Sequence, residues 1–286
     1  MSTIFKILLY LCMFFSNSSQ AAYWWDTEVP DYLQASQIKQ SNVIKDIPYG
    51  SDIRQKFDVY IPYHKVTNAP VIFLVHGGAW MSGDKASARM VVNKVNYWGE
   101  KGFIVISTNY RLAPYVSISN QIKDVVQAIN RAQALAHEWG ADKKKFILMG
   151  HSSGGHLIST ITPADVLFNP AAFIAIDAAG FDIPAIMSKK HQKFYDIAFY
   201  NPKEWLDVSP QSKASPFNFL LFCSNQSRVW CEQGNNFAKA VIKNKGTAEQ
   251  IIVNLNHNDI NEKLGNPSFT HTKFLDAYLI KLKILN

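Results

Sequence analysis

The sequence predicts an α/β fold with a mostly parallel, twisted sheet and helices on both of its faces. Continuous apolar runs at residues 71–75, 103–107 and 146–149 are typical of strands that are buried on both sides. Segments with helical spacing of apolar residues alternate with such runs, which favours a doubly wound parallel sheet. The 286 residues are 48% hydrophobic and contain no internal repeat or low-complexity linker, so we expect one domain.

The first 21 residues have the pattern of an export signal. Lys6 precedes the apolar run 7–15, and small residues lead up to a cleavage site after Ala21. The apolar run is shorter than the roughly 20 residues that a membrane-spanning helix needs. We therefore expect residues 1–21 to be a signal peptide and residues 22–286 to form the domain. The protein is expected to be secreted or periplasmic, with no stable insertion in a membrane.

The positive charge of the chain does not indicate a nucleic-acid partner. The formal net charge is +7, and loss of Lys6 with the signal would lower it by one to +6. The basic residues are scattered, and their densest run, Lys143-Lys144-Lys145, is typical of a solvated loop before a strand. No surface for nucleic acid is therefore predicted.

Two of the three cysteines would remain after removal of the signal, which contains Cys12. They are Cys223 and Cys231, which lie close together around one predicted loop. An even number of cysteines in an exported protein favours a disulfide. We predict a Cys223–Cys231 disulfide, with two separate buried thiols as the alternative.

The other elements follow from local patterns. Residues 57–61 alternate before Pro62 and predict an edge strand, whereas residues 181–212 form a long aromatic segment of mixed character. Further strands are predicted at residues 172–176, 219–222 and 251–253, and helices at residues 118–139, 235–245 and 269–285. This alternation of strands and helices is what a parallel sheet requires.

A serine stands where a buried strand is followed directly by a helix. The strand at 146–149 ends in Gly150-His151-Ser152-Ser153-Gly154. A G-x-S-x-G pattern in this context is typical of a nucleophile elbow, a strained turn that exposes the serine hydroxyl. Side chains at the two glycines would crowd the neighbouring strand and helix. We predict that Ser152 is a nucleophile; the alternative is a glycine-rich turn with an incidental serine.

Three motifs in this order resemble the esterase branch of the α/β-hydrolase fold. They are His76-Gly77-Gly78-Ala79-Trp80, Tyr110-Arg111-Leu112-Ala113-Pro114 and Gly150-His151-Ser152-Ser153-Gly154-Gly155. This branch includes hormone-sensitive-lipase-like and feruloyl or acetyl-xylan carboxylesterases and the kynurenine formamidases. The resemblance extends from about Tyr49 to the C-terminus. It departs from the branch at Ala79, at Ser153, where alanine is usual, and in the loop expected to carry the catalytic acid.

The resemblance implies an oxyanion hole formed by the backbone N–H groups of Gly78, Ala79 and Ser153. Gly77 and Gly78 allow the loop after strand 71–75 to approach a bound carbonyl closely. Loss of one such donor costs about 3–4 kcal/mol of transition-state stabilisation. A tight turn without this role is the alternative for the two glycines.

His257 is the predicted catalytic base. A serine hydroxyl is a weak nucleophile at neutral pH and needs an adjacent base. Enzymes of this fold carry serine, acid and histidine in that order, so the base should follow the last strand. Of the eight histidines, His257 directly follows a late apolar strand, and its loop also resembles the catalytic-histidine loop of the branch.

Three carboxylates are candidates for the acid that supports this base. The usual position, after the next-to-last strand, falls near Gln226 or Ser227, neither of which can be an anion. Glu232 is close by, but it stands where a helix opens and a carboxylate is favourable for the helix dipole. Asp177 ends the preceding strand, as in lipases that carry the acid one strand earlier, and Asp182 is the third candidate. We favour Asp177.

The motifs together predict an exported serine hydrolase that cleaves short-acyl or aryl carboxylic esters through an acyl-enzyme. An arylformamidase-type amidase with the same machinery is one alternative, because the fold does not separate esters from amides. A catalytically impaired binding module on this fold is the other. The sequence contains no metal-ligand spacing and no phosphate-binding loop, so neither metal nor cofactor is expected. The predicted partner is a small-molecule ester, held in a pocket walled by residues 181–205.

Overall fold

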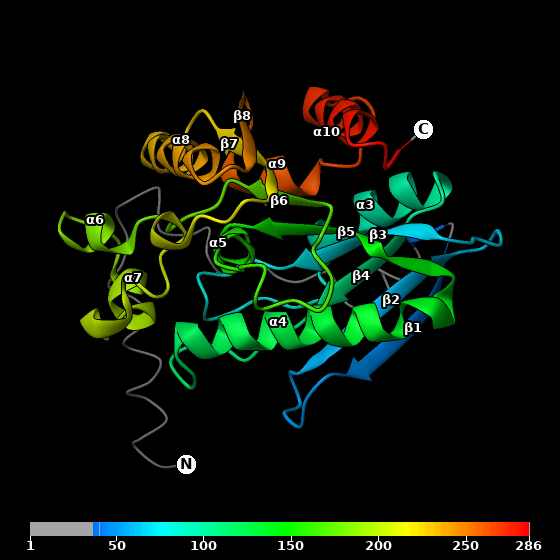
Figure 1. Ribbon diagram of the computed structural model, residues 1–286, viewed down its shortest axis with the longest axis horizontal. Helices are drawn as coiled ribbons and strands as arrows, with labels where there is room; N and C mark the ends of the chain where they lie inside the picture. Colours follow the sequence, from blue (N-terminus) through cyan, green and yellow to red (C-terminus); the bar gives the residue numbers. More distant parts are fainter. Residues whose placement is uncertain (1–36, 40, 286) are drawn as a thin grey trace, which may run out of the picture.

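The computed structural model describes residues 37–39 and 41–285, and the predicted signal peptide therefore lies outside the described residues (Figure 1). Within this part of the chain, eight strands form one sheet in the order β1-β2-β4-β3-β5-β6-β7-β8. The strands are β1 (Ser41–Pro48), β2 (Lys56–Pro62), β3 (Ala69–Val75), β4 (Ile104–Thr108), β5 (Ala141–His151), β6 (Ala172–Ile176), β7 (Asn218–Ser224) and β8 (Thr247–Val253). The β1–β2 and β2–β4 pairs are antiparallel, and every neighbouring pair from β4 to β8 in this order is parallel. This confirms the predicted mostly parallel sheet.

The prediction that residues 57–61 form an edge strand is wrong. They lie in β2, which pairs with both β1 and β4, so that β1 forms the edge of the sheet. Asp58 in this strand is buried, and its carboxylate accepts a hydrogen bond from Lys85 Nζ at 2.8 Å. The prediction of a loop at Lys143-Lys144-Lys145 is also wrong. These residues lie in the first half of β5, with Lys143 and Lys144 exposed.

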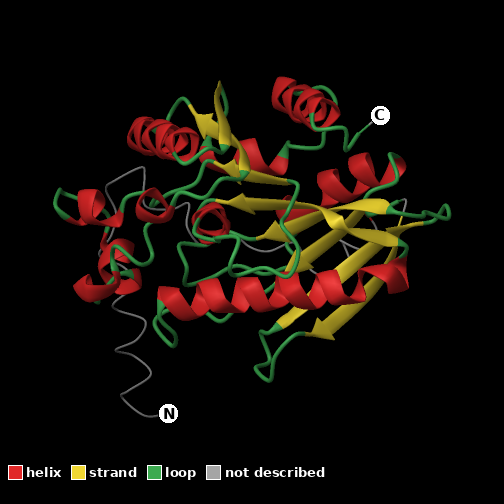
Figure 2. Cartoon of the chain, viewed as in Figure 1, coloured by secondary structure: helices red, strands yellow, loops and turns green. Residues whose placement is uncertain are grey.

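Helices cover both faces of the sheet, as predicted (Figure 2). The α-helices are α3 (Ala88–Glu100), α4 (Ile118–Leu135), α5 (Ser153–Ser159), α6 (Ile183–Met187), α7 (Lys193–Ala198), α8 (Arg228–Lys243), α9 (His257–Glu262) and α10 (Thr270–Lys281). Short 3-10 helices occupy η1 (Ala136–Trp139), η2 (Pro202–Glu204) and η3 (Pro210–Lys213). Helix α3 was not predicted, and α8 begins seven residues before the predicted 235–245.

The core has one layer on each face because alternate side chains of each buried strand point to opposite sides. In β3, Phe73 and Val75 belong to the layer that includes side chains of α4, α5 and α8, whereas Ile72 and Leu74 belong to the layer that includes side chains of α3, α9 and α10. All four side chains are fully buried. Burial of this kind stabilises the sheet by roughly 1.5–3 kcal/mol for each large apolar side chain. The central strands are therefore a rigid support for the loops at their carboxyl ends.

The strand register brings three of these loops together. His151 at the end of β5 pairs with Ile176 at the end of β6, and Ile176 pairs with Phe222 in β7. Ser152, Asp177 and the loop after β7 consequently emerge at the same edge of the sheet. Helices α6 and α7, which connect β6 to β7, lie at one end of the molecule beyond α5 (Figure 1, left). No helix in residues 37–39 and 41–285 is long and apolar enough to cross a membrane.

Candidate active site

Ser152 occupies a strained turn between β5 and α5. Its backbone has φ 52° and ψ −119°, an unusual conformation for a residue with a side chain. The turn is held by a hydrogen bond from Ser152 N to Ile176 O at 2.9 Å. A Cβ atom at Gly150 would lie 2.6 Å from Gly155 N, and one at Gly154 would lie 2.5 Å from His76 O. The glycines are therefore required for strand β5, loop 76–80 and helix α5 to pack this closely around the serine.

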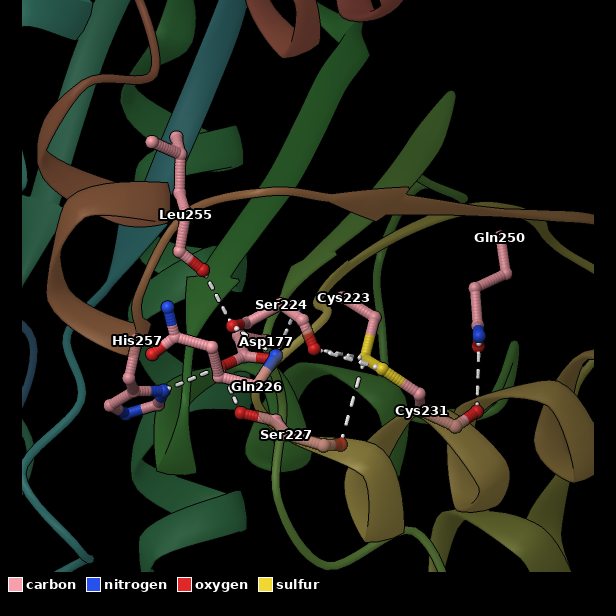
Figure 3. Close-up of a disulfide and its surroundings, with 9 residues drawn as sticks. All are labelled: Asp177, Cys223, Ser224, Gln226, Ser227, Cys231, Gln250, Leu255 and His257. Atoms are coloured by element: carbon pink, nitrogen blue, oxygen red, sulfur yellow. Dashed lines mark hydrogen bonds and ion pairs between the residues drawn. A yellow bond between two sulfur atoms is a disulfide. The ribbon is translucent and has the colours of Figure 1, made fainter.

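Asp177 directly follows β6, and its carboxylate is fully buried among three hydrogen-bond donors (Figure 3). Its Oδ2 atom accepts a hydrogen bond from His257 Nδ1 at 2.7 Å and another from Ser227 Oγ at 3.0 Å. Its Oδ1 atom accepts a hydrogen bond from Ser224 N at 2.9 Å. A buried carboxylate must be hydrogen-bonded to be tolerated, and charge-assisted bonds of this length are strong. The three donors hold the carboxylate in one orientation toward His257.

The other two candidate acids lie elsewhere. Glu232 is exposed on α8, one turn into the helix rather than at its start. Asp182 is the N-cap of α6, and its Oδ1 accepts a hydrogen bond from Ala185 N at 3.1 Å. The structure thus brings Asp177 to His257, and it gives Asp182 a local capping contact.

His257 is positioned by its place at the start of α9. Asn256 caps this helix by accepting hydrogen bonds from the N–H groups of Asn258 and Asp259. The His257 side chain is 22% exposed, which leaves it open on one side. Its ring lies against those of His151 and Trp230, with ring centroids 4.5 and 5.0 Å away. The imidazole is therefore confined between an acid, two aromatic neighbours and the solvent-facing side of the site.

His151 supports this arrangement as a neutral residue. Its Nε2 atom donates a hydrogen bond to the His257 carbonyl oxygen at 2.9 Å. Burial, with a further effect of the nearby His257, holds the pKa of His151 well below its usual range. A neutral His151 therefore places no positive charge beside the His257 ring.

The loop after β3 lies directly against Ser152. A Cβ atom on Gly77 would lie 3.0 Å from the Ser152 Cβ atom. Gly78, Ala79 and Trp80 form an unbroken run of positive φ angles at 122°, 52° and 62°. The N–H groups of Met81 and Ser82 both donate to Gly78 O at 3.0 Å, which closes the turn. Such a left-handed run costs free energy and is maintained only where the surroundings enforce it.

Trp80 and His156 anchor this loop to the core. Trp80 is fully buried, and its Nε1 atom donates to His156 Nδ1 at 3.1 Å. On the other side of the imidazole, His156 Nε2 donates to Val208 O at 2.7 Å. Burial lowers the pKa of His156 to about 4, so the ring is neutral and both of its nitrogens are used. Trp80 belongs to the first of the three sequence motifs, but the sequence alone predicts no role for it.

The Tyr110-to-Pro114 motif supports the same loop from the other side. The Tyr110 hydroxyl donates to His76 O at 3.0 Å, and the two rings stack with centroids 4.4 Å apart. Arg111 binds the buried Asp124 through two hydrogen bonds of 2.9 and 2.6 Å. The sequence does not predict this contact, because Asp124 lies in the middle of a helical pattern. Its burial opposite a bidentate arginine stabilises the turn that carries Tyr110.

The predicted disulfide between Cys223 and Cys231 is present, with Cα atoms 5.5 Å apart. It closes a short loop that carries both Ser224 and Ser227, the donors to Asp177 (Figure 3). Ser227 stands near the usual position of the acid in the branch that the sequence resembles. The loop thus contributes hydrogen-bond donors to a carboxylate on the neighbouring strand. The only sequence signal for this role was the pair of cysteines around a polar loop.

Replacing both cysteines with serine is expected to lower stability by about 2–4 kcal/mol, because a short loop is no longer closed in the unfolded chain. It should also lower turnover, because Ser224 and Ser227 are no longer held against Asp177. Thermal melting and ester turnover of the double variant measure the two effects. Peptide mapping without reductant that found both thiols free, in protein from an oxidising compartment, would contradict the disulfide.

The chain is similar in sequence to a known family and to curated proteins. The BD-FAE family matches residues 57–169. A probable isoprenylcysteine alpha-carbonyl methylesterase from Oryza sativa subsp. japonica is 32% identical over 115 residues, which cover 40% of this chain and 27% of that relative. The kynurenine formamidase of Salmo salar is 27% identical over 253 residues, which cover 82% of this chain and 81% of the relative. The chain thus spans about a quarter of the length of the methylesterase that it matches.

Solved structures show the same fold. Esterase B from Lactobacillus rhamnosis superimposes with a TM-score of 0.71 at 18% identity, covering 88% of this chain and 89% of that chain. A mostly parallel sheet with a serine on a strained strand-to-helix turn defines an α/β hydrolase. Within this fold, the chain is similar in sequence to the BD-FAE family over residues 57–169 and to the methylesterase over 115 residues.

Proposed function

We propose that this protein hydrolyses carboxylic esters with short acyl chains or aryl leaving groups, through an acyl-enzyme on Ser152. The observation that carries the proposal is the 2.7 Å hydrogen bond between His257 Nδ1 and the buried Asp177 carboxylate, at the sheet edge where Ser152 stands on its strained turn. Nucleophile, base and orienting acid are the three parts that serine acyl transfer requires.

In the proposed mechanism, His257 removes the proton of the Ser152 hydroxyl as its oxygen attacks the ester carbonyl. The negative charge on the tetrahedral intermediate is stabilised by the N–H groups of Gly78, Ala79 and Ser153. His257 then donates its proton to the leaving alcohol, and water cleaves the acyl-enzyme by the same steps. Asp177 holds the imidazole in the tautomer with a proton on Nδ1 and stabilises its charged form. The rigid attachment of Trp80 supports the role of the loop, because preorganised donors need no rearrangement during reaction.

An arylformamidase-type amidase is the alternative favoured by a specific observation. The match to kynurenine formamidase covers more of both chains than the match to the methylesterase does. A catalytically impaired binding module is disfavoured, because it would be expected to lack the serine, the histidine or the glycine loop. We keep ester hydrolysis as the main proposal, because the BD-FAE match and the methylesterase relative both indicate it.

The decisive experiment measures kcat/KM for nitrophenyl esters of increasing acyl length beside an N-formyl aromatic amine. We expect the highest values for the shortest acyl chains and lower values for the amide. Faster cleavage of the N-formyl amine than of every ester would favour the amidase. No turnover of any of these compounds by folded protein would favour the binding module.

We also propose that residues 1–21 are removed on export and that residues 22–286 act as a single secreted or periplasmic domain. The disulfide supports this proposal, because disulfides persist in oxidising compartments. N-terminal sequencing of the exported protein tests it, and an N-terminus other than residue 22 would move the cleavage site.

A further inference from the structure

A cavity of about 1120 Å³ lies between helices α6 and α7 on one side and α8 on the other. It adjoins the proposed active site through two residues that line it. Ser227 donates a hydrogen bond to Asp177, and the ring of Trp230 lies 5.0 Å from that of His257. Ser152, Asp177 and His257 are not among its lining residues. The cavity thus lies beside the proposed active site, with Trp230 between it and the imidazole.

The lining of the cavity is predominantly cationic. It contains two carboxylates, Asp182 and Glu232, against five permanent cations, and Asp182 is already engaged as the N-cap of α6. The cations are Lys189, Lys190, Arg228, Lys239 and Lys243. Among the described residues, none of these five forms an ion pair. A concave surface with one sign of charge attracts and concentrates ligands of the opposite sign.

Two buried polar atoms in the cavity wall also lack partners. Tyr195 is 3% exposed, and neither its hydroxyl nor the Oε1 atom of Gln211 has a hydrogen bond within the described part of the chain. Burial raises the pKa of Tyr195, the neighbouring Trp230 side chain acts in the opposite direction, and the Tyr195 hydroxyl has no hydrogen bond of normal geometry. A buried polar group without a partner costs about 1–3 kcal/mol. Both atoms can be satisfied by a ligand, with Tyr195 as a donor and Gln211 as an acceptor.

We propose that this cavity binds the part of the substrate remote from the scissile bond, and that this part carries a carboxylate. The inference rests on the proposed ester hydrolysis and names a substrate class for it. The cations and the Tyr195 hydroxyl supply the charge and the donor that a carboxylate requires. The volume exceeds what a short acyl chain fills, since pockets for drug-sized ligands span about 300–1,000 Å³. Because Trp230 separates the cavity from His257, the carboxylate must be joined to the ester by a spacer.

The first test compares anionic and neutral esters of equal length. One arm places the carboxylate on the acyl side, as in mono-nitrophenyl adipate, and the other arm places it on the alcohol side, as in a butyryl ester of a hydroxypentanoate. Each is paired with the compound in which a primary amide replaces the carboxylate. We expect kcat/KM to be about tenfold or more higher for the anion in one arm, which identifies the half of the substrate that enters the cavity. Equal values in both arms would overturn the proposal.

A matched pair of charge-reversal variants locates the effect. Lys239→Glu with Lys243→Glu on α8 should lower the anionic-to-neutral ratio of kcat/KM by about tenfold, because it reverses two cations of the wall. Lys273→Glu with Lys281→Glu on α10 makes the same change in net charge on the other face of the sheet. Both pairs include one exposed lysine in the last turn of a helix. The α10 double variant should leave the anionic-to-neutral ratio of kcat/KM unchanged. An equal loss in both double variants would show a long-range charge effect and contradict binding of the carboxylate in the cavity.

The Tyr195→Phe variant tests the unpartnered hydroxyl. It should lower the ratio severalfold without lowering the melting temperature, because the hydroxyl makes no hydrogen bond in the protein to lose. Titration calorimetry with adipate tests the cavity independently of turnover. Binding by wild type that is lost in the α8 pair supports the inference even if no ester is cleaved, and in that case the proposed function alone fails. Absence of adipate binding together with equal kinetics on anionic and neutral esters would overturn the inference.

Discussion

Replacing Ser152 with alanine is expected to reduce ester turnover by about 10⁶-fold and to abolish labelling by a fluorophosphonate probe. The substitution removes only the hydroxyl group, and the acyl-enzyme cannot form without it. Residual activity would come from the oxyanion donors and from substrate binding, which act without the nucleophile. Labelling is followed by mass spectrometry, and turnover is measured on a neutral short-acyl ester.

Ser159→Ala is the matched control for this prediction. Ser159 is a fully buried serine on α5, the helix that Ser152 precedes, and its Oγ atom donates within that helix to Gly155 O at 2.7 Å. This variant should be labelled like the wild type. Persistent labelling of the Ser152 variant at another residue would show that the nucleophile has been assigned to the wrong serine.

Replacing Asp177 with asparagine is expected to lower kcat by about 10⁴-fold, the loss known for a triad with the wrong histidine tautomer. An asparagine can still accept the hydrogen bond from Ser224 N, but its amide would present a donor to His257 Nδ1 in place of an acceptor. The imidazole then loses both its orientation and the charge that stabilises its protonated form. Turnover on a neutral ester measures the loss, and thermal melting shows whether the variant folds.

Glu232→Gln provides the comparison for Asp177→Asn. Glu232 is exposed on α8, so its substitution should change turnover by no more than a few fold. A large loss in this variant with little loss in Asp177→Asn would reverse the assignment of the acid. Little loss in either variant would indicate Asp182 or a serine–histidine pair completed without an acid.

Local patterns in the sequence determined the main features of the fold and of the nucleophile turn. Continuous apolar runs predict buried parallel strands because such strands have no polar face, and β3, β4 and β6 lie close to the predicted residues. The glycines around Ser152 predict a close approach of backbone to backbone, which the structure contains. The cysteine pair predicted a disulfide because few residues separate its members. Each of these features depends on residues that are near one another in the chain.

Features that depend on contacts between distant segments were decided by the tertiary structure alone. The sequence left three carboxylates open as the acid, because the hydrogen bond from His257 to Asp177 joins residues 80 positions apart. The pairing of β6 with β7 brings Ser224 and Ser227 to that carboxylate, although a serine-rich loop by itself indicates only a turn. The Trp80–His156 bond joins residues 76 positions apart. The buried Asp58 likewise meets Lys85 from another segment, 27 positions away. Hydrophobic periodicity records which side chains are buried, but which polar groups meet depends on strand register and loop path, which periodicity does not encode.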